Sequence, residues 1–115
     1  MSKKFTSVIT RAGRERITDA IVTGEKVVFS HMSVGDGGGN AILPTDTLIS
    51  LSNELYRSEL NSLKVQDESK NIIVAEMIMP PEIGGFTIRE AALFNDEGIC
   101  MAVASVPETY KPRLE

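Results

Sequence analysis

Residues 86–94 alternate well between two sides, and this pattern restricts the fold more than any other feature of the sequence. One side has Phe86, Ile88, Glu90, Ala92 and Phe94, and the other has Thr87, Arg89, Ala91 and Leu93. A period of two is typical of a β-strand with two different faces. The next four residues, Asn-Asp-Glu-Gly at 95–98, are typical of a tight turn. A second apolar segment follows at 99–106 and stops before Pro107. Together they predict an antiparallel hairpin.

Three further segments read as strands. Residues 27–34 are rich in β-branched and apolar side chains and end in the glycine-rich run 35–40. Residues 55–65, with room for a bulge, and 72–79 flank a charged turn at 66–71 and predict a second hairpin. Residues 41–53 are expected to form a loop, with a short helical turn at 44–48. Its apolar anchors would be Leu43, Leu48, Ile49 and Leu51.

One helix is predicted near the start of the chain. Apolar residues recur at three-to-four spacing from Ile9 to Ile21, with Thr6, Ser7 and Thr10 as possible N-caps and Gly24 as the stop. Gly13 inside this pattern costs about 1 kcal/mol relative to alanine, which a close packing contact would explain. We therefore expect a single α+β domain over residues 1–115, with an N-terminal helix packed on a mainly antiparallel sheet or meander of about five strands.

Composition excludes several functions. The chain has a net charge of −4 and scattered basic residues, so binding to a nucleic-acid backbone is not expected. No apolar run approaches membrane-spanning length, so membrane insertion is not expected either. The single cysteine, Cys100, lies in an apolar run and reads as a buried, inert thiol.

The glycine-rich loop at Gly35–Gly39 is the most tempting ligand motif. It lacks the Lys-Ser/Thr ending of a phosphate loop and the spacing of a dinucleotide loop. His31, the only histidine, has no partner nucleophile or carboxylate close to it in sequence. We therefore predict no catalytic residues, no metal site and no cofactor. The alternative left open is a small ligand-binding or protein-interaction domain that uses this loop, with His31 beside it.

Arg89 and Glu90 are neighbours on a predicted strand, so their side chains point to opposite faces. One of them must point into the protein or into an interface, and a charge buried there needs a partner. A structural salt bridge and an interface role both satisfy this condition.

Several motifs, in this order, resemble the N-terminal domain of phage tail-collar fibre proteins, as found in P2-like phages. The most specific is Gly-Gly-Phe-Thr-Ile-Arg-Glu at 84–90, followed by Leu93-Phe94. Ala92 stands where we expect glycine in that family. The other matching stretches are residues 9–13, 29–37, 53–57, 60–63 and the closing Pro-Glu-Thr-Tyr-Lys-Pro at 107–112.

The resemblance implies a structural virion protein that attaches the fibre to a baseplate protein and so supports adhesion to the host. It implies assembly in the bacterial cytoplasm, a homotrimeric fibre, and a longer protein of which this chain is a fragment; the final Leu-Glu could be a cloning scar. Attachment would use anchor-type side chains. The candidates for the partner interface are Tyr56, Arg57, Phe86, Arg89, Glu90 and Tyr110.

Overall fold

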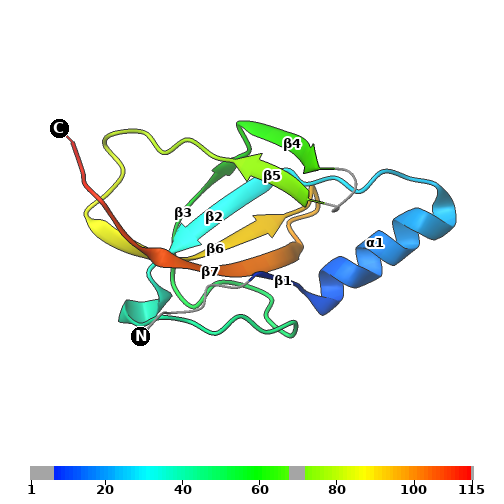
Figure 1. The fold of residues 1–115 in the computed structure, drawn as a ribbon, viewed down its shortest axis with the longest axis horizontal. Helices are drawn as coiled ribbons and strands as arrows, with labels where there is room; N and C mark the ends of the chain where they lie inside the picture. The colour runs from blue at the N-terminus through cyan, green and yellow to red at the C-terminus, as the bar shows by residue number, and fades with distance from the viewer. Residues whose placement is uncertain (1–6, 68–71, 115) are drawn as a thin grey trace.

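A five-stranded antiparallel sheet forms the body of the molecule in the computed structural model, which describes residues 7–67 and 72–114 (Figure 1). The strand order is β1-β7-β6-β2-β3, and β4 and β5 form a separate two-stranded sheet. This confirms the predicted α+β class and the sheet of about five strands. The strand bounds are β1 Ser7–Ile9, β2 His31–Gly35, β3 Glu54–Glu59, β4 Ser62–Asp67, β5 Ile72–Glu76, β6 Phe86–Phe94 and β7 Cys100–Lys111.

Helix α1, Arg11–Thr23, begins at the N-cap Thr10 and ends at Gly24, as two of the sequence signals predicted. Gly13 is the one buried residue of this helix. A Cβ at this position would collide with the backbone of Met101 in β7, so glycine allows the helix and the strand to pack this closely. The predicted close contact at Gly13 is therefore confirmed. Ile9 is not part of the helix but the last residue of β1, a short edge strand that the helical pattern concealed.

The region of residues 55–65 is not one long strand. β3 ends at Glu59 and pairs with β2, whereas β4 begins at Ser62 and pairs with β5. The hairpin of β4 and β5 was predicted, but β6 does not continue it as a meander, because β6 pairs with β2 and β7. Residues 68–71, in the predicted charged turn, lie outside the described residues.

We predicted that the last strand stops before Pro107, but this prediction was wrong. β7 continues to Lys111, and the pairing shifts so that Ile88 faces Thr109 while Glu90 faces Ser105. The extra residues on β7 form a bulge around Pro107. A bulge is one of the few places where a sheet accommodates proline, because the missing hydrogen bond is not needed there.

The buried core lies on one face of the sheet, beneath the loop that links β2 to β3. Two of the four expected anchors, Leu51 and Leu48, pack there, while Leu43 and Ile49 are 82% and 80% exposed. Within this loop, η1 (Gly37–Gly39) is a short 3-10 helix, and a single turn closes between Thr45 and Leu48. The core residues on the sheet are Ala92, Phe94, Cys100 and Val103, with Val8 beside them.

β2 is also shorter than predicted. It begins at His31 rather than at residue 27, and the chain between the end of α1 and Ser30 forms no regular element. Ser30 donates its backbone N–H to the carbonyl of Phe94, just before β2 begins.

Candidate docking surfaces

Glu90 is fully buried, and its carboxylate accepts three backbone hydrogen bonds from both ends of the β2–β3 loop. The N–H of Gly37 donates to one oxygen at 2.8 Å, and that of Asn53 donates to the same oxygen at 2.9 Å. The N–H of Ser52 donates to the other oxygen at 2.7 Å. Charge-assisted bonds of this kind are roughly twice as strong as neutral ones. The carboxylate therefore fastens the loop over the core.

Arg89 holds the same loop from the neighbouring position. Its guanidinium donates to the backbone carbonyl of Asp36 at 3.1 Å, and its Nε lies 3.5 Å from a carboxylate oxygen of Glu108. Of the two alternatives open for Arg89 and Glu90, the structure thus provides internal partners for both side chains. Contact of either side chain with a partner protein stays a prediction.

The backbone N–H groups of Gly37–Gly39 all donate hydrogen bonds to other groups of the protein. Gly37 donates to Glu90, and Gly38 donates to the carboxylate of Asp36 at 2.8 Å. Gly39 donates to the carbonyl of Asp36 at 3.2 Å. The bonds from the Asn53 side chain and from Gly38, with the nearby Arg89 charge, lower the pKa of Asp36. No backbone N–H of Gly37–Gly39 is left to bind a phosphate.

The side chain of His31 has a hydrogen-bonding neighbour in the adjacent residue, Ser30. His31 is the first residue of β2, and its Nδ1 lies 2.8 Å from the hydroxyl of Ser30. No group of three or more histidine, cysteine, aspartate or glutamate side chains suited to a metal occurs among the described residues. Cys100 is buried, and burial raises the pKa of its thiol, which keeps it protonated.

Two of the predicted interface residues, Tyr56 and Arg57, are neighbours on the edge strand β3. Tyr56 is half-buried and faces Val34 of β2, while Arg57 lies over the ring of Phe94 at 3.7 Å from its centroid. Arg57 also forms an ion pair with Glu54 at 2.7 Å. Arg57 therefore has an internal role in covering the core, and Tyr56 keeps part of its surface free.

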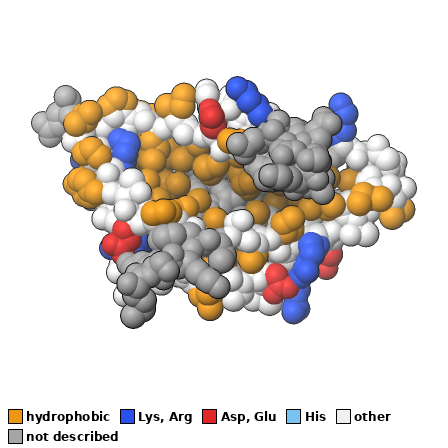
Figure 2. All heavy atoms as spheres, in the orientation of Figure 1, with side chains coloured by type: hydrophobic (Ala, Val, Ile, Leu, Met, Phe, Trp, Pro, Cys, Tyr) orange, Lys and Arg blue, Asp and Glu red, His pale blue; other side chains and the backbone are white. Residues whose placement is uncertain are grey.

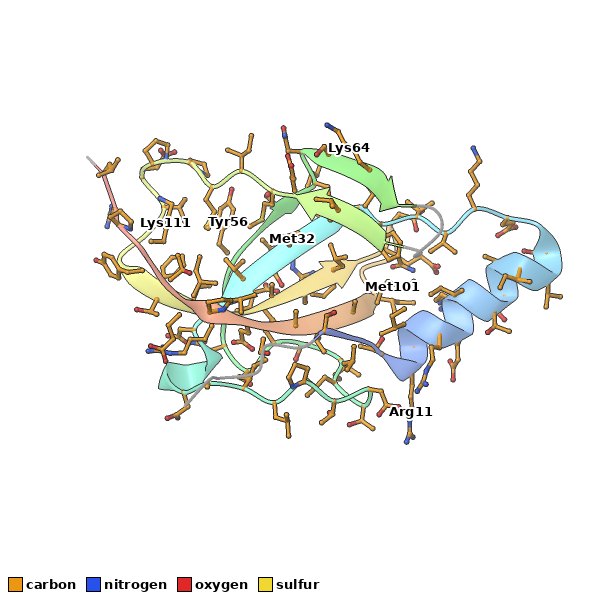
Figure 3. The ribbon with its side chains drawn as sticks, in the orientation of Figure 1. Arg11, Met32, Tyr56, Lys64, Met101 and Lys111 are labelled. Carbon is orange, nitrogen blue, oxygen red and sulfur yellow. The ribbon has the colours of Figure 1, made fainter. Side chains whose placement is uncertain are left out.

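Phe86 and Tyr110 lie where β6 begins and β7 ends. Tyr110 is 63% exposed and faces Thr87, whereas Phe86 is half-buried. Beside them Lys111, labelled in Figure 3, donates its ammonium to the carbonyl of Ile83 at 2.8 Å and to that of Pro112 at 3.0 Å. This fastens the C-terminal segment to residues 80–85 and fixes the position of Tyr110.

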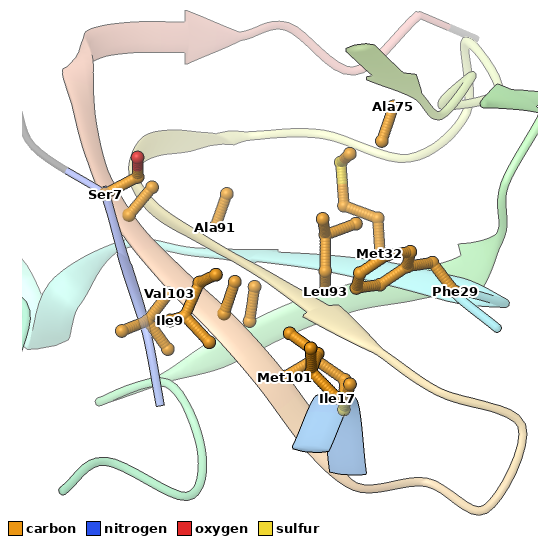
Figure 4. Close-up of a pocket in the computed structure, with 13 residues that line it drawn as sticks. Ser7, Ile9, Ile17, Phe29, Met32, Ala75, Ala91, Leu93, Met101 and Val103 are labelled. Carbon is orange, nitrogen blue, oxygen red and sulfur yellow. The ribbon is translucent and has the colours of Figure 1, made fainter. Parts of the chain in front are cut away.

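The other face of the sheet carries an apolar groove that sequence reasoning missed (Figure 4). Its volume is about 490 Å³, and none of its lining residues is charged. Strands β6 and β7 form the floor of the groove, with Ala91 from β6 and Ala102 and Ala104 from β7. Larger side chains complete the lining, namely Ile9, Ile17, Phe29, Met32, Leu93 and Met101. The alternation in residues 86–94 contained the signal, because Ala91 and Leu93 make its second face apolar as well.

Figure 2 shows hydrophobic side chains gathered across the middle of this face, with charged side chains towards its periphery. Ala75 of β5 also lines the groove, so the β4–β5 hairpin lies over part of the sheet. Across the described part of the chain, no helix is long and apolar enough to cross a membrane.

Comparison with known proteins agrees with this architecture. The chain matches the family described as phage tail-collar fibre protein, N-terminal, over residues 1–115. It is 43% identical to the probable tail fiber protein of Escherichia phage P2 over 115 residues. That match covers 99% of this chain and 17% of the phage protein. No solved structure matches. The chain therefore belongs to the phage tail-collar fibre family and corresponds to its N-terminal domain.

Proposed function

We propose that this chain is the anchoring end of a virion tail fibre and that it attaches the fibre to a protein of the tail baseplate. The observation that carries the proposal is the family match over the whole of residues 1–115. The phage P2 relative, itself a probable tail fiber protein, continues far beyond the matched region. We infer that the remainder of such a fibre forms a homotrimeric shaft and reaches the host, while this domain, made in the bacterial cytoplasm, enters the virion.

The geometry is that of a scaffold rather than of a reactive pocket. The most buried charged group, Glu90, is committed to three backbone donors and has no remaining role in chemistry. Such a carboxylate makes the β2–β3 loop rigid, and rigid surfaces lose little entropy when they bind a partner. These properties support a structural, non-enzymatic role.

The exposed anchor at the baseplate end is proposed to be Tyr110, with Phe86 and Arg89 of the adjoining strand β6 as further candidates and Tyr56 and Arg57 as a second group. Tyrosine and arginine are enriched among residues that dominate binding energy. Tyr110 combines high exposure with a backbone held by β6 and by the Lys111 contacts. A fixed, exposed aromatic ring is well suited to enter a pocket on a partner.

Co-purification of the chain with the baseplate protein from the same phage tests the proposal. We expect Tyr110→Ala to weaken association about 30-fold, corresponding to ~2 kcal/mol for a hot-spot residue. Glu15→Ala, an exposed change on α1, is the matched control and should bind normally. Absence of association with the unmodified chain would contradict attachment through this domain.

A further inference from the structure

The residues that follow β7 run along the surface of the protein instead of pointing away from it. Residues 112–114, called the strap below, lie beside residues 80–85, which come between β5 and β6 (Figure 1). The backbone N–H of Leu114 donates to the carbonyl of Pro81 at 2.8 Å. The N–H of Gly85 donates to the carbonyl of Lys111, just before the strap, at 2.7 Å. Backbone hydrogen bonds therefore join the two segments on either side of Pro112.

The ammonium of Lys111 supplies donors that the backbone lacks in this region. Pro80, Pro81 and Pro112 each offer a carbonyl but no N–H. Lys111 donates to the carbonyl of Ile83 at 2.8 Å, to that of Pro112 at 3.0 Å and to that of Pro80 at 3.5 Å. A lysine ammonium is a donor-only group with a proton for each of these carbonyls. Because bonds from a charged donor are stronger than neutral ones, this side chain is the main tie between the segments.

Gly84 allows the two backbones to approach closely. A Cβ at this position would lie 2.3 Å from the carbonyl oxygen of Pro112 and 2.8 Å from the backbone nitrogen of Arg113. Gly84 has no positive φ, unlike Gly85 with a φ of 84°. Glycine at position 84 is therefore explained by contact with the strap, whereas glycine at position 85 is explained by the turn.

Apolar burial contributes little to holding the strap. All of its residues are exposed, and Leu114 is 58% exposed. The last residues of a domain are usually poorly ordered unless something ties them down. The ties here are the hydrogen bonds of Lys111 and Leu114, together with the restricted backbone at Pro112. Loss of the Lys111 ammonium should therefore release the strap without disturbing the core.

We propose that the strap fixes the direction in which the fibre leaves this domain, with Lys111 as the positioning residue. A free linker lets the chain that follows it point in many directions. The strap instead passes the orientation of β7, and with it that of Tyr110, to the chain beyond it. This consequence rests on the function proposed above, in which a longer shaft follows the domain.

Hydrogen exchange of the 115-residue chain, followed residue by residue by NMR, tests whether Lys111 holds the strap. We expect Lys111→Met to speed exchange at the N–H groups of Gly85 and Leu114 about tenfold or more. Methionine keeps an apolar stem of similar length but removes the charged donor. Lys64→Met removes the same charge from an exposed position on β4 and should leave both rates within about twofold. Equal rates in the two variants would overturn the proposal.

Gly84→Ala tests the close approach while Lys111 stays in place. The added Cβ should displace the strap and speed exchange at Leu114 by a similar factor. Glu82→Ala, at an exposed position of the same segment, is the matched control and should leave that rate unchanged. The N–H of Asn95, bonded within the turn between β6 and β7, should exchange alike in all these variants, which shows that the change is local. An unchanged rate at Leu114 in Gly84→Ala would also overturn the proposal.

Spin labels on α1 and on the strap measure the exit direction. Thr18→Cys and Leu114→Cys provide exposed labelling positions, and the buried Cys100 should not react. Pulsed dipolar spectroscopy should give a narrow distribution of distances between the labels, which broadens when Lys111→Met is added. A broad distribution with Lys111 in place would overturn the fixed exit. A distribution that stays narrow with methionine would overturn the role of Lys111.

These measurements use the isolated chain, so they separate the strap from attachment. If the unmodified chain fails to co-purify with the baseplate protein yet its Leu114 N–H is protected in the manner expected, attachment is wrong and the strap stands. If the chain co-purifies but Lys111→Met leaves exchange at Leu114 unchanged, attachment stands and the strap is wrong.

Discussion

The two faces of the central sheet are built from the same strands but are closed in different ways. One face is covered by the β2–β3 loop, whose Leu48 and Leu51 pack on Phe94 and Val103. The other face is an alanine-floored groove that the chain itself leaves partly open. Adjacent residues of β6 contribute to both, because successive side chains alternate between the faces.

The two faces differ in the polar side chains that hold a loop against them. On the covered face, Glu90 gathers three backbone N–H groups of the loop, and Arg89 takes the carbonyl of Asp36. The groove contains no charged side chain to fasten a loop. A buried charge that accepts several hydrogen bonds can thus hold an irregular segment over a core.

Removal of the Glu90 carboxylate should produce the largest effect. We expect Glu90→Ala to lower the free energy of unfolding by about 3–5 kcal/mol, because three backbone N–H groups of the loop lose their charged acceptor. Urea denaturation measures the change. Glu82→Ala removes an equal charge from an exposed position and should stay within about 0.5 kcal/mol of the unmodified chain. Similar values for both variants would show that the fastening is unimportant.

Truncating one leucine on each face compares their packing. Leu51→Ala on the covered face should cost about 2–4 kcal/mol, since it leaves a cavity in a closed core. Leu93→Ala at the groove should cost about 1 kcal/mol, because this half-buried side chain is already partly in water. Equal losses, measured by the same denaturation, would mean that the groove is as fully packed as the core.

The regular part of this arrangement was predictable from sequence. The alternation in β6, the turn at 95–98 and the end of α1 at Gly24 all follow from local rules, and the structure has them where the pattern placed them. In that turn the side chain of Asn95 accepts the N–H groups of Glu97 and Ile99, which is the reason for asparagine there. Local hydrogen bonding leaves a local sequence signal.

Long-range choices left no such signal. Nothing in residues 55–65 indicates that β3 joins β2 while β4 joins β5, because both halves are equally strand-like. Pro107 was misleading, since the bulge that accommodates it depends on the register with Ile88 and Glu90. The role of Glu90 was visible only as an ambiguity between inward and interface positions. Its donors lie 37 to 53 residues away in sequence.

Thr10 joins helix α1 to the sheet, because its side chain caps the helix and also bonds to β7. Its hydroxyl accepts the N–H of Gly13 at 2.9 Å and donates to the carbonyl of Cys100 at 2.6 Å. Thr10→Val should cost about 1–2 kcal/mol, measured by thermal unfolding. Thr10→Ser keeps the hydroxyl and should recover most of this loss. If serine instead loses more stability than valine, packing of the methyl group rather than capping is what matters.

The smallest expected effect is the pH dependence of stability that Asp36, in the loop on the covered face, contributes. Hydrogen bonds from Asn53 and Gly38 hold the pKa of Asp36 below its usual value of 3.8. A carboxyl group with a lowered pKa stabilises the folded state when the pH is above its usual pKa. This contribution fades as the pH falls through the pKa that the group has in the folded protein. Asp36→Asn keeps an acceptor for Gly38 but cannot titrate. The gap in urea midpoint between the unmodified chain and this variant should therefore be constant from pH 7 to about pH 5 and shrink below about pH 4. A gap that stays constant down to pH 3 would show that Asp36 gains nothing from its contacts, and Glu90 and Arg89 would then fasten the loop without it.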